Sequence, residues 1–313
     1  MALVGAVALV VAALIGARLL RGAAWTRRQP VAAIAAWQMV QGAVLLAMVW
    51  IPVLALAPEI GSEATLQEFV IGCLHGLVAV VSQPDQRVVA AAASVVILLT
   101  TGRLLAVFVT SWRCRRRERA TARAAVALVG SDGPVGVRVV PGRSVGAYCV
   151  PGRRPLVVMT SAATEELSSV EVAAVVAHER AHLKWRHHLV LIGSQTVADA
   201  FPFVDAFVDA ERECRLLIEM AADDQAIRVV GPGPLATALL RSALSSGLPP
   251  ATLGMGRTAV HERVERLEVC RAGNRSHGLV AWVPLLLPVV VGSMVVTHTL
   301  TEWITALASC EGL

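Results

Sequence analysis

The sequence predicts an α-helical membrane protein with four transmembrane helices and a cytoplasmic α+β domain. The chain of 313 residues is 56% hydrophobic and only 16% charged, whereas a soluble domain is usually about one quarter charged. Long uncharged stretches lie near both ends, and a more polar segment lies between them. This distribution indicates one unit in a lipid bilayer and another unit outside it.

Four stretches are apolar over the roughly 20 residues that a transmembrane helix needs. They are residues 2–20, 31–57, 88–110 and 279–300. The third is interrupted only by Arg103, whose long side chain can reach the membrane interface. The first has no basic segment ahead of it, which favours a retained span over a cleaved signal peptide. We expect a membrane domain over 1–112, a second domain over 113–277, and a last span with a short outer tail over 278–313.

The charges of the connecting segments predict the orientation of these helices. Acids dominate the second connection, whereas arginines flank the first connection and follow the third span. These arginines are Arg18, Arg21, Arg27, Arg28, Arg113, Arg115, Arg116, Arg117 and Arg119. Because cytoplasmic loops carry the excess of Lys and Arg, we expect a multi-pass plasma-membrane protein with both termini outside and 113–277 in the cytoplasm. We expect the arginine run after the third span to contact membrane lipid, and no direct binding of nucleic acid.

The cytoplasmic segment opens with β-like runs and continues with helices. The β-like runs are 135–140, 145–150 and 156–160, with Pro-Gly turns between them. Ser168 and Glu171 form a capping-box pattern ahead of an apolar run, which predicts a helix that begins about ten residues before His178. Further helices are expected over 206–230, 234–245 and 258–270.

The apolar segment 189–207 needs a separate interpretation. It contains Asp199 and Asp205, and it is too short and too charged for a confident span. We interpret it as a hairpin that dips against the membrane. A fifth span is the alternative, and it would carry Glu219 to the side opposite His178.

Six cysteines show no C-x-x-C spacing, which argues against a cysteine zinc knuckle or a thioredoxin-type pair. Cys73 and Cys310 both fall on the predicted outer side, where a disulfide between them is an open question. The other four are expected to be free thiols in the cytoplasm.

The clearest chemistry lies in His178, Glu179 and His182, which form an H-E-x-x-H motif inside the predicted helix. Positions i and i+4 share one helix face, so both imidazoles can bind one Zn²⁺ while the carboxylate acts as a general base toward water. A zinc hydrolase needs a third protein ligand, and Glu219 on the next long helix is the best candidate. Asp223, one turn further on, can accept a hydrogen bond from a ligand imidazole.

Several roles around this motif stay open from spacing alone. Other acids that could serve as third ligand are Glu211, Glu213 and Asp224. His261 and Arg263 are candidates for stabilising the oxyanion or contacting substrate, although nothing in the sequence places either of them in the site. His187 and His188, just beyond the motif, are interpreted as a solvated or interfacial helix end rather than as extra ligands.

Two segments of the sequence resemble those of the BlaR/MecR-type membrane metallopeptidases. They are VAAVVAHERAHL over 172–183 and EMAAD over 219–223. The segments 147–152 and 155–159 are similar to the strands ahead of that family's catalytic helix, and the order of three spans, a domain and one span also matches. The resemblance implies a gluzincin-like zinc peptidase domain. Its metal ligands would be His178, His182 and Glu219, with Glu179 as general base.

The resemblance also implies a cytoplasmic protein substrate, typically a transcriptional repressor in a signalling pathway, such as a winged-helix repressor. Such a substrate is expected to add as an extended strand to the edge strand 145–150. This chain departs from the family in two places. Antibiotic-sensing members carry a large outer penicillin-binding domain where 301–313 stand here, so β-lactam sensing by that route is not expected. In addition, His187 stands where the family often has an acid.

Two other functions compete with this interpretation. An HtpX-type quality-control peptidase would use the same site on damaged membrane proteins, and VHERV over 260–264 is similar to that family's late His/Arg stretch. A non-catalytic membrane receptor with a vestigial zinc site is the alternative from another class. The sequence leaves the oligomeric state open, including a homo-oligomer.

Overall fold

In a computed structural model of the protein, the structure describes residues 2–56, 84–245 and 254–271. The predicted last span lies outside these residues, and so do Cys73 and Cys310. The fourth transmembrane helix and the Cys73–Cys310 disulfide therefore stay predictions.

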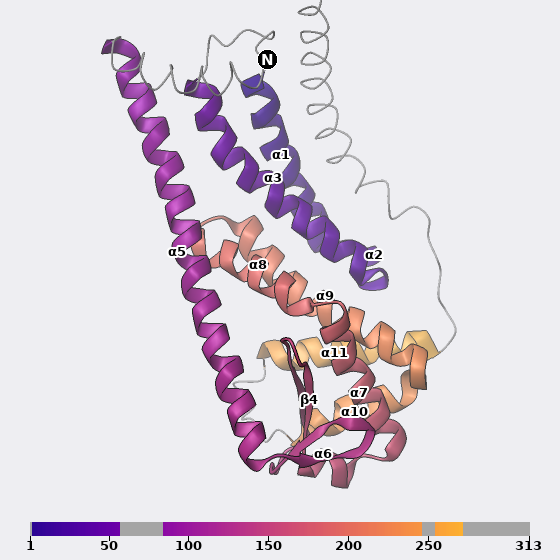
Figure 1. Cartoon of the computed structure of the whole chain (residues 1–313). Helices are drawn as coiled ribbons and strands as arrows, with labels where there is room; N and C mark the ends of the chain where they lie inside the picture. Colours follow the sequence, from indigo (N-terminus) through magenta and orange to yellow (C-terminus); the bar gives the residue numbers. More distant parts are fainter. Residues whose placement is uncertain (1, 57–83, 246–253, 272–313) are drawn as a thin grey trace, which may run out of the picture.

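Three helices form the apolar end of the molecule (Figure 1). They are α1 (Ala2–Arg21), α3 (Pro30–Leu56) and α5 (Pro84–Val129), and the short α2 (Ala24–Arg28) joins the first two. Within the described residues, the segments Pro30–Val49 and Ala91–Val129 are long and apolar enough to cross a membrane. These two segments support a membrane-associated protein, whereas the predicted multi-pass topology stays a prediction.

The helix α5 runs without a break through the expected domain boundary at 112/113. Its 46 residues extend over about 69 Å at 1.5 Å per residue, more than twice the roughly 30 Å of a hydrocarbon core. Beyond Trp112 the sequence is rich in Arg and Ala, which are strong helix formers, so nothing ends the helix there. One rigid element thus belongs to both expected domains.

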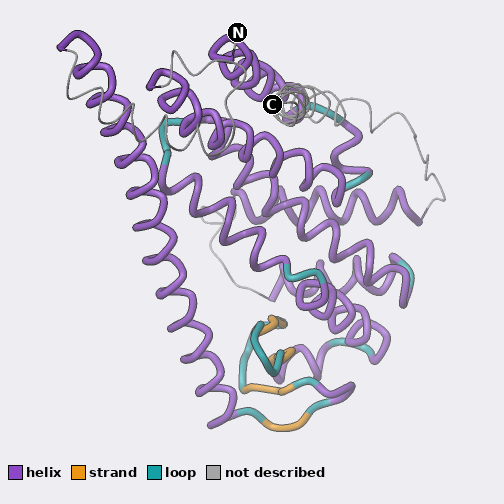
Figure 2. Tube along the Cα trace, turned by 45° about the horizontal axis from the view of Figure 1, so that its top comes forward, coloured by secondary structure: helices purple, strands orange, loops and turns teal. Residues whose placement is uncertain are grey.

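A small sheet lies beside the far end of α5 (Figures 1 and 2). Its strands are β1 (Ser131–Asp132), β2 (Arg138–Val140), β3 (Ala147–Val150) and β4 (Leu156–Thr160), in the order β1-β2-β4-β3. The three predicted β-like runs are confirmed: β2 and β3 are shorter than expected, and β4 has the expected bounds. Strand β3 pairs antiparallel with β4 and forms an edge of the sheet.

Both faces of this sheet are covered by buried aliphatic side chains. On one face Val150 and Val158 pack with Val126 of α5. On the other face Val157 and Met159 pack in the same cluster as residues of the helices that follow. The edge strand is therefore held between α5 and the helical part of the domain.

Six helices complete the described chain. They are α6 (Ser161–Glu166), α7 (Ser169–Lys184), α8 (His187–Ala200), α9 (Asp205–Val230), α10 (Pro232–Ser245) and α11 (Gly254–Arg271). The predicted capping box starts α7: the Ser168 amide donates to Glu171 Oε2 at 2.7 Å, and the Glu171 amide donates to Ser168 Oγ at 3.3 Å. Helix α9 ends at Gly231, whose φ of +78° suits glycine.

The segment 189–207 is a helical hairpin, in which α8 turns at Phe201 into α9. Phe201 and Phe207 pack with Ala13 of α1 and Val44 of α3, and Leu104 of α5 closes the same cluster. The chain thus reverses its direction where it packs against the three apolar helices, and α9 runs back toward α7. A fifth span is excluded, because Glu219 reaches His178 (below).

Candidate metal centre

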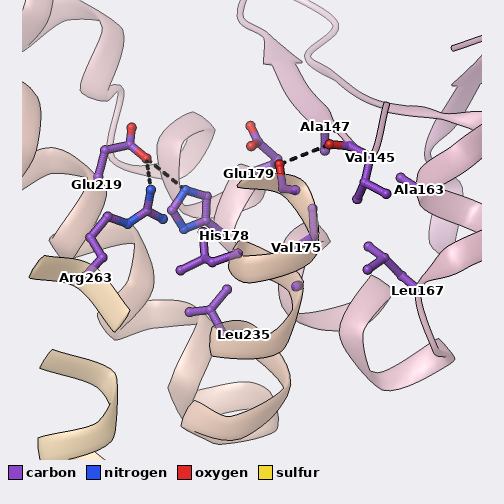
Figure 3. A pocket seen from close by; sticks show the side chains of 14 residues that line it. Val145, Ala147, Ala163, Leu167, Val175, His178, Glu179, Glu219, Leu235 and Arg263 are labelled. Carbon is purple, nitrogen blue, oxygen red and sulfur yellow. Dashed lines mark hydrogen bonds and ion pairs between the residues drawn. The ribbon is translucent and has the colours of Figure 1, made fainter. Parts of the chain in front are cut away.

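The two central helices α7 and α9 pack closely and bring the predicted site residues together. Ala174 and Ala226, both fully buried, lie in the cluster between them, and such small side chains allow a close approach. Helix α7 contributes His178 and His182 from one face. Helix α9 contributes Glu219, which lies beside His178 (Figure 3). The facing helices therefore place three ligand-type side chains at one point.

The spacing of the three donor groups fits a zinc ion. His178 Nε2 lies 3.1 Å from His182 Nε2 and 3.4 Å from Glu219 Oε2, and His182 Nε2 lies 3.5 Å from Glu219 Oε1. Ligand atoms at about 2.05 Å from a tetrahedral zinc ion are about 3.3 Å apart, so the observed distances are those of a tetrahedron edge. The set of two imidazoles and one carboxylate leaves a fourth position for water or substrate.

Behind the triad, the ring of His178 is oriented by a buried carboxylate. His178 Nδ1 lies 2.9 Å from Asp223 Oδ1, which leaves Nε2 to face the other donors. Asp223 is fully buried, and Arg263 neutralises it through bonds from Nε at 2.8 Å and Nη2 at 2.7 Å. The same guanidinium donates from Nη1 to Glu219 Oε2 at 3.1 Å. Arg263 of α11 thus holds both carboxylates of α9 in place. Figure 3 shows its contact with Glu219.

The second imidazole is oriented by another histidine. His182 Nδ1 lies 3.1 Å from His187 Nδ1, and the His187 side chain is buried. His187 begins α8 as expected and is not in the group of described residues that could hold a metal ion, but its side chain is buried rather than solvated. Arg186 adopts the left-handed backbone conformation (φ +50°), which reverses the chain and turns the first residue of α8 back toward α7.

The charges of the triad shift the pKa values of its members in opposite directions. Burial alone would lower the pKa of His178, but the Asp223 and Glu219 carboxylates outweigh it and raise that pKa to about 9. Burial would raise the pKa of Glu219, but His178 and Arg263 lower it to about 2. Burial lowers the pKa of His182 to about 4, so this imidazole is neutral at pH 7, whereas a metal ion would have to displace a proton from His178.

Glu179, the residue after His178 on α7, lies between the triad and the edge strand. Burial raises its pKa, which brings this carboxylate closer to the range of a useful general base. The Cys149 thiol of β3 lies against it, and burial together with the Glu179 charge raises the pKa of that thiol to about 12. No local pattern of residues signals this contact, because it joins a strand to a helix about 30 residues away.

A cavity of about 200 Å³ opens beside Glu179 and His178 (Figure 3). Its wall is formed by small and aliphatic side chains, including Ala163, Leu167, Val175 and Leu235, with Gly146 and Ala147 at one rim. A space of this size and polarity fits an aliphatic side chain of a bound peptide.

His261 and Arg263 are the two candidates for stabilising the oxyanion or contacting substrate. Arg263 lies in the site and His261 does not. His261 is exposed and is not among the residues that line the cavity. Two residues along an α-helix differ by about 200° in direction, so a buried Arg263 turns His261 outward. In the described chain, three donor groups of Arg263 are committed to carboxylates.

The other acids that spacing left open form ion pairs elsewhere. Glu211 pairs with Arg215, Glu213 with Arg27, and Asp224 with Arg266. None of these three belongs to the group of described residues that could hold a metal ion. Glu219 is therefore the acid that the fold brings to the two histidines.

The helical fold, the small sheet and a His-His-Glu group beside a half-buried Glu are the features of a metallopeptidase site that could hold zinc, and the apolar helices support a membrane-associated protein. The model of peptidase family M48 matches residues 111–215, which include the H-E-x-x-H motif. The match supports a metallopeptidase of the M48 family and does not support the BlaR/MecR-type subfamily in particular. Comparisons with curated proteins and with solved structures find no match.

Proposed function

We propose that the protein is a membrane-embedded zinc endopeptidase that cleaves a cytoplasmic protein, with a transcriptional repressor of a signalling pathway as its substrate. The observation that carries the enzymatic part is the tetrahedral spacing of His178, His182 and Glu219 beside Glu179. The cytoplasmic location is supported by the arginine run on α5. The repressor as substrate is supported only by the BlaR/MecR-type resemblance of the residues around the motif.

The catalytic steps follow from the positions of the side chains. A zinc ion held by the triad would polarise the scissile carbonyl and acidify a water molecule. The Glu179 carboxylate would accept the proton of an attacking water molecule as the water oxygen bonds to the carbonyl carbon, and would then pass this proton to the amine nitrogen as the C–N bond breaks. Arg263 and Asp223 keep Glu219 and His178 oriented during these steps.

The edge strand gives the substrate a place to bind. In the described chain β3 pairs with β4 on one side and no strand pairs with its other edge. A substrate segment added there would run past Glu179, which lies against Cys149 of the same strand. The cavity beside Ala147 would then hold one aliphatic side chain of the substrate.

A second candidate is a quality-control peptidase of the HtpX type, acting on damaged membrane proteins. It is favoured by the position of Arg263, which belongs to the VHERV stretch that resembles that family and which lies in the site. Both candidates use the same chemistry and differ in the substrate.

The experiment compares cells that express the wild type, Glu179→Gln and the control Glu165→Gln. Glu165 is an exposed acid of α6 outside the site. Sequencing of protein N-termini should find new ends with the wild type and the control, and none with Glu179→Gln, while that variant retains zinc. Substantial cleavage by Glu179→Gln would contradict the mechanism. New ends in soluble cytoplasmic proteins support the repressor-type substrate, whereas new ends in membrane proteins support the second candidate.

A further inference from the structure

A group of three arginines stands apart from the metal centre, at the turn between β3 and β4. Arg123 of α5 and Arg153 and Arg154 of the turn line a hollow of about 630 Å³. Arg153 and Arg154 are exposed. In the described part of the chain, no carboxylate forms an ion pair with any of the three. The three guanidinium groups therefore concentrate positive charge around the hollow, and no carboxylate of the described residues neutralises it.

The position of Arg123 is fixed by the backbone of the turn. Its Nη2 donates to the carbonyl oxygens of Val150 and Pro151, at 3.3 and 3.2 Å. A Cβ on Gly152 would lie 2.6 Å from this Nη2, so the glycine permits the approach. Arg123 attaches the turn to α5, and Arg153 and Arg154 remain free to bind an anionic partner.

Strand β3 connects this arginine group to the metal centre. One end of β3, at Ala147, borders the cavity beside His178 and Glu179. The other end, at Val150, is held by Arg123. Three strand residues extend over about 10 Å, so a peptide along the free edge of β3 would meet both features within one short segment.

Distance from the bilayer disfavours lipid headgroups as the partner. The headgroup layer adds only about 5–8 Å to each side of the hydrocarbon core. If the third span ends near residue 110, Arg123 lies about 20 Å further along α5, or about 18 Å with an ordinary tilt. The arginines from Arg113 to Arg119 fall within or near the headgroup layer, whereas the group at the β3–β4 turn lies beyond it.

We propose that Arg123, Arg153 and Arg154 form a specificity site for acidic side chains of the substrate. This inference rests on the proposed peptidase function. Antiparallel pairing is slightly the more stable arrangement, and a substrate strand antiparallel to β3 has its N-terminal part beside Val150. The preferred substrate therefore carries an aliphatic residue for the cavity and acidic residues about three to six positions before it.

The test measures peptide binding without turnover. The probe is a fluorescent dodecapeptide with one Leu and three Glu residues placed four to six positions before it. Matched peptides carry Gln in place of Glu, or the Glu residues after the Leu. Binding to the full-length, zinc-loaded Glu179→Gln protein in neutral-lipid nanodiscs is followed by fluorescence anisotropy. We expect the first peptide to bind about tenfold more tightly than either matched peptide, from two or three partly exposed ion pairs.

Paired variants in the same background assign this preference to the arginines. Arg153→Gln/Arg154→Gln should abolish the tenfold preference, and Arg153→Glu/Arg154→Glu should transfer it to a peptide with Lys in place of Glu. The control Arg116→Gln/Arg117→Gln removes two exposed charges of α5 and should leave the preference unchanged. A transferred preference requires a folded protein, so misfolding cannot produce it.

Other outcomes overturn the inference. They are equal binding of the Glu and Gln peptides, preference for Glu after the Leu, or a preference that survives Arg153→Gln/Arg154→Gln. Loss of binding to anionic vesicles by that variant, with unchanged peptide binding, would identify a lipid contact instead. Cleavage of the same peptides by the active protein separates the two claims. Arginine-dependent binding without any cleavage would refute the peptidase function and leave the arginine binding site. Cleavage at the same rate for Glu and Gln peptides would support the peptidase function and refute the arginine site.

Discussion

Replacement of Arg263 by Gln is the most direct test of how Arg263 holds the carboxylates of the candidate metal centre in place. The change removes three hydrogen bonds to Asp223 and Glu219 and leaves two carboxylates without their cation. Asp223 is fully buried and Arg263 nearly so, and removing one partner of such a pair costs about 3–5 kcal/mol. The free energy of unfolding of the metal-free variant should fall by about that amount.

The variant should also bind zinc more weakly. Asp223 orients His178 and is itself held by Arg263, and loss of such a supporting contact lowers metal affinity by about 10–100-fold. Guanidinium denaturation in detergent, followed by tryptophan fluorescence, gives the first quantity, and competition with a chromogenic chelator gives the second. The control is Arg215→Gln, whose ion pair with Glu211 is half exposed and should contribute at most about 1 kcal/mol.

The reasoning about Arg263 would be refuted if Arg263→Gln unfolded like the control variant. The double variant Arg263→Gln/Asp223→Asn provides a second check. It removes the unpaired charge together with its partner, so it should be more stable than Arg263→Gln alone. A double variant that loses the sum of the two single effects would show that the two residues act independently.

Three further predictions concern the triad and its surroundings. In the metal-free protein, His178 has a pKa raised above 6.5 to about 9, so its contribution is complete below pH 6.5 and is lost as pH rises to 9; thermal denaturation should show a falling midpoint over that range, and an unchanged midpoint would contradict the Asp223–His178 contact. His187→Ala should weaken zinc binding about 10–100-fold, with part of it restored in His187→Asn, because His187 orients His182; chelator competition measures this, and equal affinities of both variants and the wild type would remove the role. Ala163→Leu should fill part of the cavity and reduce cleavage of peptides with a large aliphatic residue more than of peptides with Ala, in a comparison of kcat/KM values; a uniform loss would indicate misfolding instead.

The features that could be predicted from the sequence depend on residues within one or two helical turns of each other. The capping box of Ser168 and Glu171 and the shared face of His178 and His182 depend only on local spacing, and the structure contains both. The Pro-Gly turns likewise separated the β-like runs correctly.

The features that could not be predicted depend on distant packing. Arg263 reaches the site from a helix 40 residues beyond Asp223, and no local pattern states which face of that helix is buried. His187 enters the site because one residue, Arg186, adopts a left-handed conformation that the sequence does not signal. Glu219 was the best of several acids from spacing alone, and only the packing of α7 on α9 separates it from Glu211 and Asp224.

The polar contact between α3 and α8 has a mechanical consequence. Gln38 Nε2 donates to Ser194 Oγ at 2.7 Å and to Gln41 Oε1 at 3.1 Å, and Ser194 is fully buried between apolar helices. Sliding α3 past α8 would leave these buried groups unpaired, at a cost of about 1–3 kcal/mol each. Trp37 of α3 is also packed into the cluster that contains Leu217 of α9. A shift of α3 along its own axis would therefore act on α8 and on α9, the helix that carries Glu219.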